Sequence, residues 1–179
     1  MKKHGTLLLL LAVFLLPLGL AKLVLDLNWY QGGVTNRGQL LASPLASEWL
    51  GQSGKWQLVY LMPDECDEGC AGALFNLRQI PQAVGAGQER VDALVLVAES
   101  KLSELQAEFL QGLEPKRVPE YVITQLHTLE YGSHAIYIAD PLGNVMMAYP
   151  LVKGKDAVLA QGKDLLRDLK RLLKVSKIG

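Results

Sequence analysis

The chain has 179 residues, in which 18 lysines and arginines balance 18 aspartates and glutamates, and it has two cysteines. This balance gives no bulk charge that would attract nucleic acid, and the sequence has no four-ligand zinc spacing, phosphate-binding loop or GxSxG motif. Roughly 150 residues follow the apolar N-terminal segment, which is enough for one domain with its own hydrophobic core.

The N-terminal segment predicts a membrane anchor. A short basic stretch, residues 1–5, precedes an apolar run over residues 6–25 in which Lys22 is the charged residue. About 20 apolar residues suffice to cross a bilayer, and the positive charge before them predicts that end in the cytoplasm. We therefore expect a single-pass protein of the inner (cytoplasmic) membrane with its C-terminal domain in the periplasm. A signal peptide cleaved near Ala21 is the alternative, and it leads to the same oxidising compartment.

After the anchor, the sequence alternates strand and helix patterns. Turn signals over residues 26–54 predict a juxtamembrane linker and an irregular lead-in, and residues 55–179 predict the folded domain. In that domain we expect a strand over 55–62, a helix over 70–84, a buried strand over 91–98, a helix from Ser100 or Ser103 to Leu110, a loop over 114–120, a helix or strand over 121–129, paired strands over 135–139 and 145–149, and a helix over 156–174. This is the thioredoxin order, and it predicts an α/β three-layer sandwich with a mixed central sheet.

The two cysteines lie between the first predicted strand and the following helix. Cys66 and Cys70 are four positions apart, in the kind of turn where thioredoxin-like domains place redox or metal chemistry. Three chemistries are open: a disulfide that exchanges with a partner, a copper(I) ion held by two thiolates, or a structural bridge. In the loop-entropy model a bridge over so short a loop contributes only about 2 kcal/mol, which is little for a domain able to fold unaided.

Four carboxylates flank the cysteine pair: Asp64, Glu65, Asp67 and Glu68. Nearby negative charge raises the pKa of a thiol and disfavours the thiolate nucleophile, whereas it stabilises a bound cation. The positive end of the helix at Cys70 acts in the opposite direction, but its effect is modest. Soft sulfur ligands select copper(I) among the metals that a cell offers. The local charge therefore favours metal binding over fast thiol exchange.

A selective copper site needs a third ligand, and His134 is the best candidate. It directly precedes the strand over 135–139, and in a thioredoxin-like sheet the loop before that strand lies beside the cysteine turn. An ordinary exposed loop histidine is the alternative interpretation. His127 is a weaker candidate that is more typical of a surface or packing residue, and His4 lies in the cytoplasmic segment. The predicted metal ligands are therefore Cys66, Cys70 and His134.

Two family resemblances follow from these motifs. Residues 54–60 with the Cys-x-x-x-Cys turn, and a histidine before a strand that ends in Asp140-Pro141-x-Gly143, resemble the Sco family of membrane-anchored copper chaperones. The chain resembles more closely the small membrane-anchored thioredoxin-fold proteins associated with bacterial cytochrome oxidase assembly. That resemblance covers nearly the whole chain and rests on residues 28–30, 33–38, 140–147 and the ending 163–179.

The Sco resemblance implies copper(I) bound by Cys66, Cys70 and His134, and delivery of copper to the dinuclear centre of an oxidase subunit. The chain departs from the Sco pattern at the residues after its cysteines, Asp67 and Ala71, where that pattern has prolines. His134 also precedes the Asp-Pro turn by six residues rather than about eight, an even shift that keeps the same face of a strand.

We therefore predict a periplasm-facing thioredoxin-like protein that assists cytochrome c oxidase assembly. It would act by copper(I) binding, or by thiol reduction at the oxidase copper site carried out by the pair Cys66 and Cys70, with an oxidase subunit or another assembly factor as its partner. Cys66 and Cys70 are the catalytic residues if it is a thiol-disulfide oxidoreductase, whereas a metallochaperone is not an enzyme. The alternatives are an assembly scaffold with a structural disulfide and a general oxidoreductase unconnected with metal.

The C-terminal helix is rich in basic residues. These side chains would face anionic lipid beneath a tethered domain, or they would simply complement the helix dipole. Asp164 and Asp168 are expected to dilute the basic patch. The basic residues are Lys163, Arg167, Lys170, Arg171, Lys174 and Lys177.

Overall fold

The computed structural model describes residues 2–27, 29, 35–98, 110 and 112–178. The chain divides into two compact units, residues 1–35 and 36–179. The first unit contains helix α1, Lys2–Asp26. Its segment Gly5–Asp26 has a mean hydropathy of 2.6, and among the described residues it is the one helix long and apolar enough to cross a membrane. The expected apolar helix at the N-terminus is thus confirmed.

The second unit is built on a mixed six-stranded sheet. In space the strands follow the order β1-β6-β5-β2-β3-β4. Strands β2, β3 and β4 are parallel, whereas β5 runs antiparallel to β2, and β6 pairs antiparallel with both β5 and β1. The bounds are β1 Gln39–Ala46, β2 Trp56–Leu61, β3 Val91–Ala98, β4 Pro115–Val118, β5 Ala135–Ala139 and β6 Asn144–Pro150.

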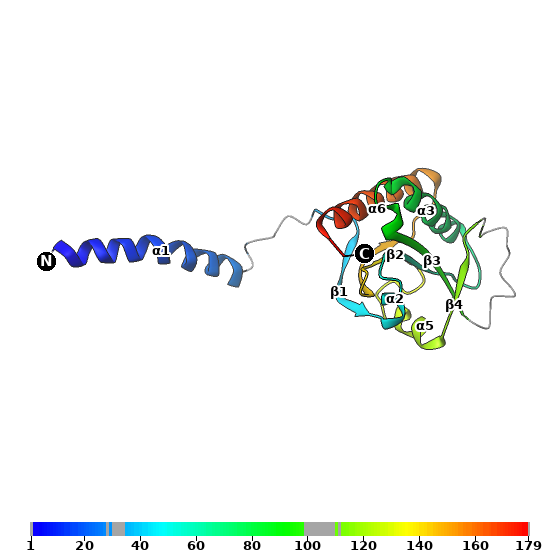
Figure 1. Ribbon diagram of the computed structural model, residues 1–179, viewed down its shortest axis with the longest axis horizontal. Coiled ribbons are helices and arrows are strands. Elements are labelled where there is room, and N and C mark those ends of the chain that lie inside the picture. The colour runs from blue at the N-terminus through cyan, green and yellow to red at the C-terminus, as the bar shows by residue number, and fades with distance from the viewer. Residues whose placement is uncertain (1, 28, 30–34, 99–109, 111, 179) are drawn as a thin grey trace. The chain divides into compact units, whose positions relative to one another are not determined.

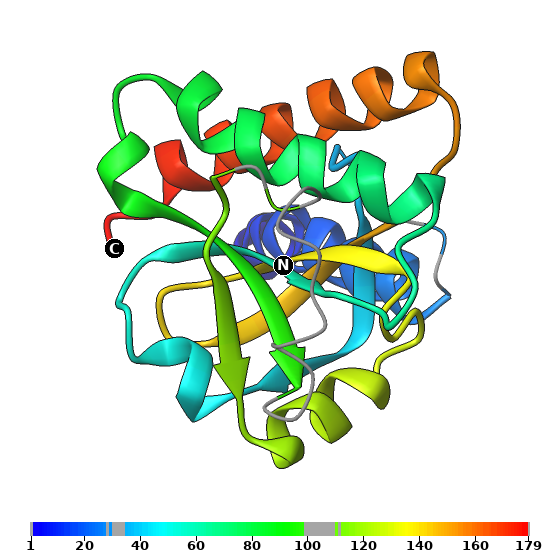
Figure 2. The ribbon, with the colours of Figure 1, turned by 90° about the vertical axis from the view of Figure 1, so that its right-hand side faces the viewer.

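Helices cover both faces of this sheet. Helices α3 (Glu68–Val84) and α6 (Lys155–Val175) pack together on one face, and α2 (Glu48–Gly51) and α5 (Glu120–His127) lie on the other (Figures 1 and 2). A short 3-10 helix, η1 (Gln88–Arg90), leads into β3. The predicted three-layer α/β sandwich with a mixed central sheet is therefore confirmed.

Strand β2 lies at the centre of two hydrophobic cores. All six of its residues are buried, as expected for a strand covered on both faces. Leu58 and Tyr60 pack on the side of α3 and α6, and Val59 and Leu61 pack on the side of α2 and α5. This alternation follows from the two-residue period of a strand. The end of β2 is therefore packed against helices on both faces of the sheet.

Two segments differ from the sequence-based expectation. Residues 26–54, predicted as linker and irregular lead-in, include strand β1 and helix α2, and residues 114–120, predicted as loop, include strand β4. Both strands are edges of the sheet, where burial is partial and proline is tolerated. The ambiguous segment 121–129 is helix α5, and the helix expected from Ser100 or Ser103 falls largely outside the described residues.

A buried carboxylate fixes the entry to β1 against α6. Asp168 is 2% exposed, and it accepts hydrogen bonds from the Arg37 backbone N–H at 2.6 Å, the Gly38 N–H at 2.9 Å and the Tyr149 hydroxyl at 2.7 Å. A Cβ atom at Gly38 would lie 2.5 Å from the Tyr149 ring, so glycine allows this close approach. We call this set of contacts the Asp168 clamp. It holds residues 37–38, which connect the domain to the N-terminal unit.

Candidate functional site

The two cysteines are joined where β2 gives way to α3. The Cys66–Cys70 disulfide has an S–S distance of 1.97 Å, with the Cα atoms 5.2 Å apart. Cys70 lies in the first turn of α3 and is fully buried in the core that contains Leu58 and Tyr60. Cys66 lies in the turn before the helix and is half-buried. The two sulfurs therefore differ in access: solvent reaches Cys66 but not Cys70.

Asp67 begins the helix between the two cysteines. As the N-cap residue of α3, it accepts a hydrogen bond from the Cys70 backbone N–H at 3.0 Å. Its other carboxylate oxygen lies 2.9 Å from the Lys153 ammonium, and the Glu68 carboxylate accepts the Gly154 N–H at 2.9 Å. Two of the four flanking carboxylates are thus attached to the segment between β6 and α6, which the sequence-based analysis did not anticipate.

These contacts set the charge of the site. The hydrogen bond from Cys70 N–H and the neighbouring Lys153 hold the pKa of Asp67 below its usual range, and Asp67 in turn raises the pKa of Lys153. The contribution of Asp67 to stability is present above its unfolded-state pKa and is lost as pH falls through its folded-state pKa. That of Lys153 is present below its unfolded-state pKa and is lost as pH rises through its folded-state pKa. Both groups are therefore charged and paired at neutral pH.

Tyr60 is a buried polar residue in the core that contains Cys70, and sequence reasoning missed it. It belongs to the same core cluster as Cys66 and Cys70, and its hydroxyl oxygen is buried without a hydrogen-bond partner among the described residues. Burial, with a further effect of Asp67, raises the pKa of the Tyr60 hydroxyl. The signal available in the sequence was its position as the second-to-last residue of the buried strand β2. Lys153 gave no such signal, because only the tertiary fold brings it to Asp67.

His134 lies at the same end of the central strands β2 and β5 as the cysteine turn. Strand β5 is antiparallel to β2 with Ile136 opposite Tyr60, so the residue before β5 is near the end of β2. The His134 carbonyl accepts the Leu151 N–H at 2.8 Å, and a Cβ at Gly69 would be 3.4 Å from Leu151. Leu151 is therefore hydrogen-bonded to the backbone of His134 and lies close to Gly69 at the start of α3.

The structure does not assemble the three predicted ligands into one group. It brings Cys66 and Cys70 together in the disulfide, while His134 is exposed. Within the part of the chain that the structure describes, no cluster of three or more histidine, cysteine, aspartate or glutamate side chains is close enough to hold a metal ion. The three-ligand site stays a prediction. His127, the weaker candidate, is exposed in the last turn of α5, on the other face of the sheet.

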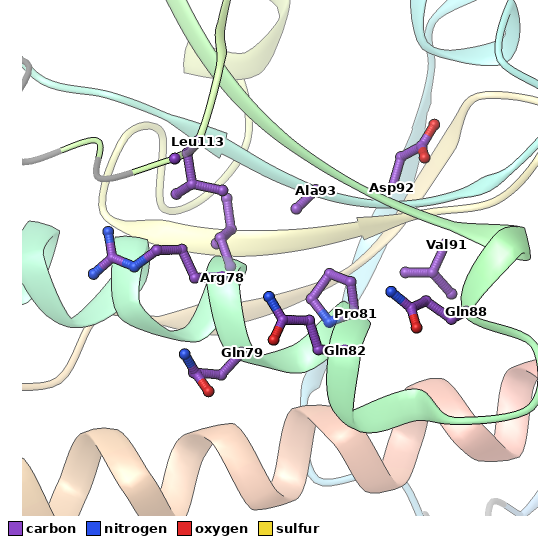
Figure 3. A pocket seen from close by; sticks show the side chains of 11 residues that line it. Arg78, Gln79, Pro81, Gln82, Gln88, Val91, Asp92, Ala93 and Leu113 are labelled. Atoms are coloured by element: carbon purple, nitrogen blue, oxygen red, sulfur yellow. The ribbon is translucent and has the colours of Figure 1, made fainter.

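A separate pocket of about 420 Å³ lies farther along α3. Its polar lining includes Arg78, Gln79 and Gln82 from α3, Gln88 from η1 and Asp92 from β3 (Figure 3). Neither cysteine and neither candidate histidine lines it. The pocket is therefore distinct from the cysteine turn.

The charge of Asp67 should control the reactivity of the reduced cysteine pair. We expect Asp67→Asn to lower the pKa of the Cys66 thiol by roughly half a unit, about threefold in thiolate fraction at neutral pH, because a nearby negative charge is removed. Asparagine also caps helices, so the hydrogen bond to Cys70 N–H can persist. The measurement is the pH dependence of thiol alkylation in the reduced protein. Glu65→Gln is the matched control; an equal shift in both variants would contradict a special role for Asp67.

The domain matches a known family model. The model described as "Transmembrane-like, thioredoxin-like, C-terminal domain" matches residues 56–176, which run from the start of β2 to just beyond the end of α6. No curated protein matches the chain at a significant level.

Three solved structures resemble the chain distantly. A SCO1/SenC family lipoprotein from Bacillus anthracis is 15% identical with a TM-score of 0.47, and the match covers 76% of this chain and 94% of that one. Copper-bound ScoI from Bradyrhizobium japonicum is 16% identical with a TM-score of 0.41, covering 70% and 97% of the two chains. A PrxQ mutant from Xylella fastidiosa is 16% identical with a TM-score of 0.47, covering 78% and 98%. Likeness at this level assigns no function to the chain.

Proposed function

This chain belongs to the family of transmembrane-like, thioredoxin-like C-terminal domains, and from that premise we propose that it is a membrane-anchored thiol-disulfide protein that assists cytochrome c oxidase assembly from the periplasmic side. The observation that carries the proposal is the closed Cys66–Cys70 pair, in which Cys66 is half-buried and Cys70 is fully buried. Such a pair can react with a partner at one sulfur and resolve the product with the other. The apolar helix α1 would hold the domain at the inner membrane.

The proposed step reduces a disulfide in a partner protein. In the reduced protein the Cys66 thiolate attacks one sulfur of the partner disulfide, which forms a mixed disulfide and releases one partner thiolate. The Cys70 thiolate then attacks the Cys66 sulfur, releasing the second partner thiolate and forming the bond seen in the structure. Two electrons pass to the partner, so a dithiol reductant must regenerate the pair. An oxidase subunit that needs free thiols to receive copper is the partner class we propose.

Single-cysteine variants test which sulfur reacts with the partner. We expect Cys70→Ser, which leaves Cys66, to form a mixed disulfide with oxidised glutathione at least about tenfold faster than Cys66→Ser, because exposure controls thiol access. The full chain in nanodiscs is used, and the mixed disulfide is quantified by intact mass. Each variant lacks the disulfide, so the comparison is matched. Equal rates would contradict the assignment of Cys66 as the attacking sulfur.

Copper(I) binding is a second candidate, favoured by the position of His134 at the same end of the central strands as the cysteine turn. The donor set fits the ion, because two thiolates and an imidazole are ligands that copper(I) accepts. Copper would be the cargo of the protein, and it would bind only after the disulfide is reduced. Cys66, Cys70 and His134 are the proposed ligands.

Copper titration tests this second candidate. We expect the reduced full chain to bind one equivalent of copper(I), and His134→Ala to weaken the affinity at least about tenfold. His127→Ala is the matched control, because it removes an exposed histidine on the other face of the sheet. Unchanged affinity in His134→Ala would exclude the three-ligand site. If a Cys66→Ser/Cys70→Ser double variant still restored oxidase assembly in cells, the protein would instead be a scaffold.

A further inference from the structure

Helix α6 presents a continuous basic face. Lys163, Arg167, Lys170 and Lys174 follow one another at spacings of three or four residues, so they lie on one side of the helix, and all four are exposed. The opposite side of the helix carries the buried residues Leu165, Leu169 and Leu173. Among the described residues no ion pair is formed by any of the four cations. They therefore make a positive surface, which we call the α6 basic face.

Asp164 and Asp168, the two acidic residues expected to dilute this basic face, both contact the segment that enters β1. Asp168 is buried in the clamp with three hydrogen-bond donors, and Asp164 lies 3.9 Å from the Arg37 guanidinium. Both carboxylates are directed to the segment that enters β1. The Asp168 charge is therefore buried away from the outward face, and the half-exposed Asp164 carboxylate lies toward Arg37, so the four cations give that face a positive sign.

The end of α6 adds exposed apolar side chains beside the cations. Val175 is 77% exposed and Ile178 is 51% exposed. The Arg90 guanidinium fixes this end by donating hydrogen bonds to the carbonyls of Leu173 at 3.1 Å, Ser176 at 3.0 Å and Ile178 at 2.9 Å. Exposed apolar side chains next to lysines are typical of a surface that lies in a lipid interface. The helix therefore ends in an ordered tip that suits lipid headgroups.

Chain length allows this face to reach a membrane that holds α1. Ten residues lie between Asp26, the end of α1, and Arg37. A fully extended chain spans at most about 3.6 Å per step, and the eleven steps from Asp26 to Arg37 therefore reach about 40 Å. Arg37 is held on α6 itself by the clamp. A membrane that holds α1 would therefore lie within about 40 Å of Arg37, a distance that permits the α6 basic face to reach it.

We propose that the α6 basic face binds the anionic phospholipid headgroups of the membrane that anchors the chain. Each lysine or arginine near an anionic surface strengthens association about fivefold, so four cations together give substantial occupancy of the docked state. The cysteine turn contacts Lys153 and Gly154 at the opposite end of α6, so docking leaves it uncovered. This inference does not depend on the chemistry of the cysteines.

Lysine acetylation in nanodiscs tests the proposal with the full chain. A neutral acetylating reagent is applied to the protein in phosphatidylcholine bilayers and in bilayers containing phosphatidylglycerol, and each lysine is quantified by mass spectrometry. We expect acetylation of Lys163, Lys170 and Lys174 to slow about fivefold or more in the anionic bilayer only, and to recover at high salt. Lys116 on β4 is the internal control and should change by less than about twofold.

A charge-reversal variant separates docking from a general effect of the bilayer. Lys170→Glu/Lys174→Glu should abolish the protection of Lys163 in the anionic bilayer while leaving Lys116 unchanged. Equal acetylation of Lys163, Lys170 and Lys174 in the two bilayers would overturn the proposal. Protection that persists in the charge-reversal variant would overturn it as well. Neither result bears on the thiol reactions of Cys66.

Discussion

Replacing Asp168 with alanine is expected to lower the free energy of unfolding by about 3 kcal/mol, because hydrogen bonds to a buried charged group are strong and their loss leaves donors unsatisfied. The Asp168 carboxylate is 2% exposed and accepts three hydrogen bonds. Its removal would leave the Tyr149 hydroxyl and the N–H groups of Arg37 and Gly38 without their acceptor. Urea denaturation of the full chain, followed by circular dichroism, measures the effect.

Two matched variants identify the clamp as the cause. Tyr149→Phe removes one of the three donors and should cost about 1 to 2 kcal/mol. Asp164→Ala removes a neighbouring acid with a long, exposed contact to Arg37, and should cost less than about 1 kcal/mol. If Asp164→Ala lowered the free energy of unfolding as much as Asp168→Ala, the loss would come from removing a negative charge from α6 and not from the hydrogen bonds of Asp168. The Asp168 clamp would then have no special role.

Gly143→Ala is the second large effect, with an expected loss of about 4 kcal/mol from a positive backbone angle combined with a backbone clash. Gly143 has φ +86°, and a Cβ there would overlap the Ser47 carbonyl oxygen and lie 2.5 Å from the Gly51 nitrogen. The clash involves backbone on both sides, so no side-chain rotation relieves it. The Ser47 N–H also donates to the Gly143 carbonyl at 3.0 Å, which fastens the β5–β6 turn to α2. Thermal unfolding of the variant measures the loss.

Gly54→Ala is the control for the backbone angle alone. Gly54 has φ +64°, but a Cβ there would have nothing within 4 Å. We expect a loss of about 1 kcal/mol from the left-handed conformation. Similar losses in the two variants would show that the packing of the turn against α2 contributes little. A larger loss at Gly143 supports the close approach as the reason for glycine in the Asp140–Asn144 turn.

Contacts on two sides hold the cysteine turn in place. The core on the α3 and α6 side buries Cys70, and the segment between β6 and α6 holds Asp67 and Glu68 through Lys153 and Gly154. The start of α3 is therefore restrained on both sides of the disulfide. A substitution at residue 153 or 154 would therefore alter the contacts that hold the start of α3 next to the cysteines, although neither residue contacts a sulfur through these bonds.

Local patterns in the sequence determined the parts of this protein that depend on neighbouring residues. The apolar run of α1, the buried strands β2 and β3 and the periodic stripe of α6 were all predictable, because period and hydrophobicity are properties of a short segment. The position of the cysteine pair between a strand and a helix was predictable for the same reason. The family order of these elements then indicated the three-layer sandwich.

Only the tertiary structure decided the features that join distant segments. The edge strands β1 and β4 lack a buried pattern of their own, and they exist because β6 and β3 offer unpaired backbone groups. The pairing of Asp67 with Lys153 and the burial of Asp168 against residues 37–38 join positions far apart in the chain. Such contacts depend on how the layers pack, and a linear pattern does not carry that information.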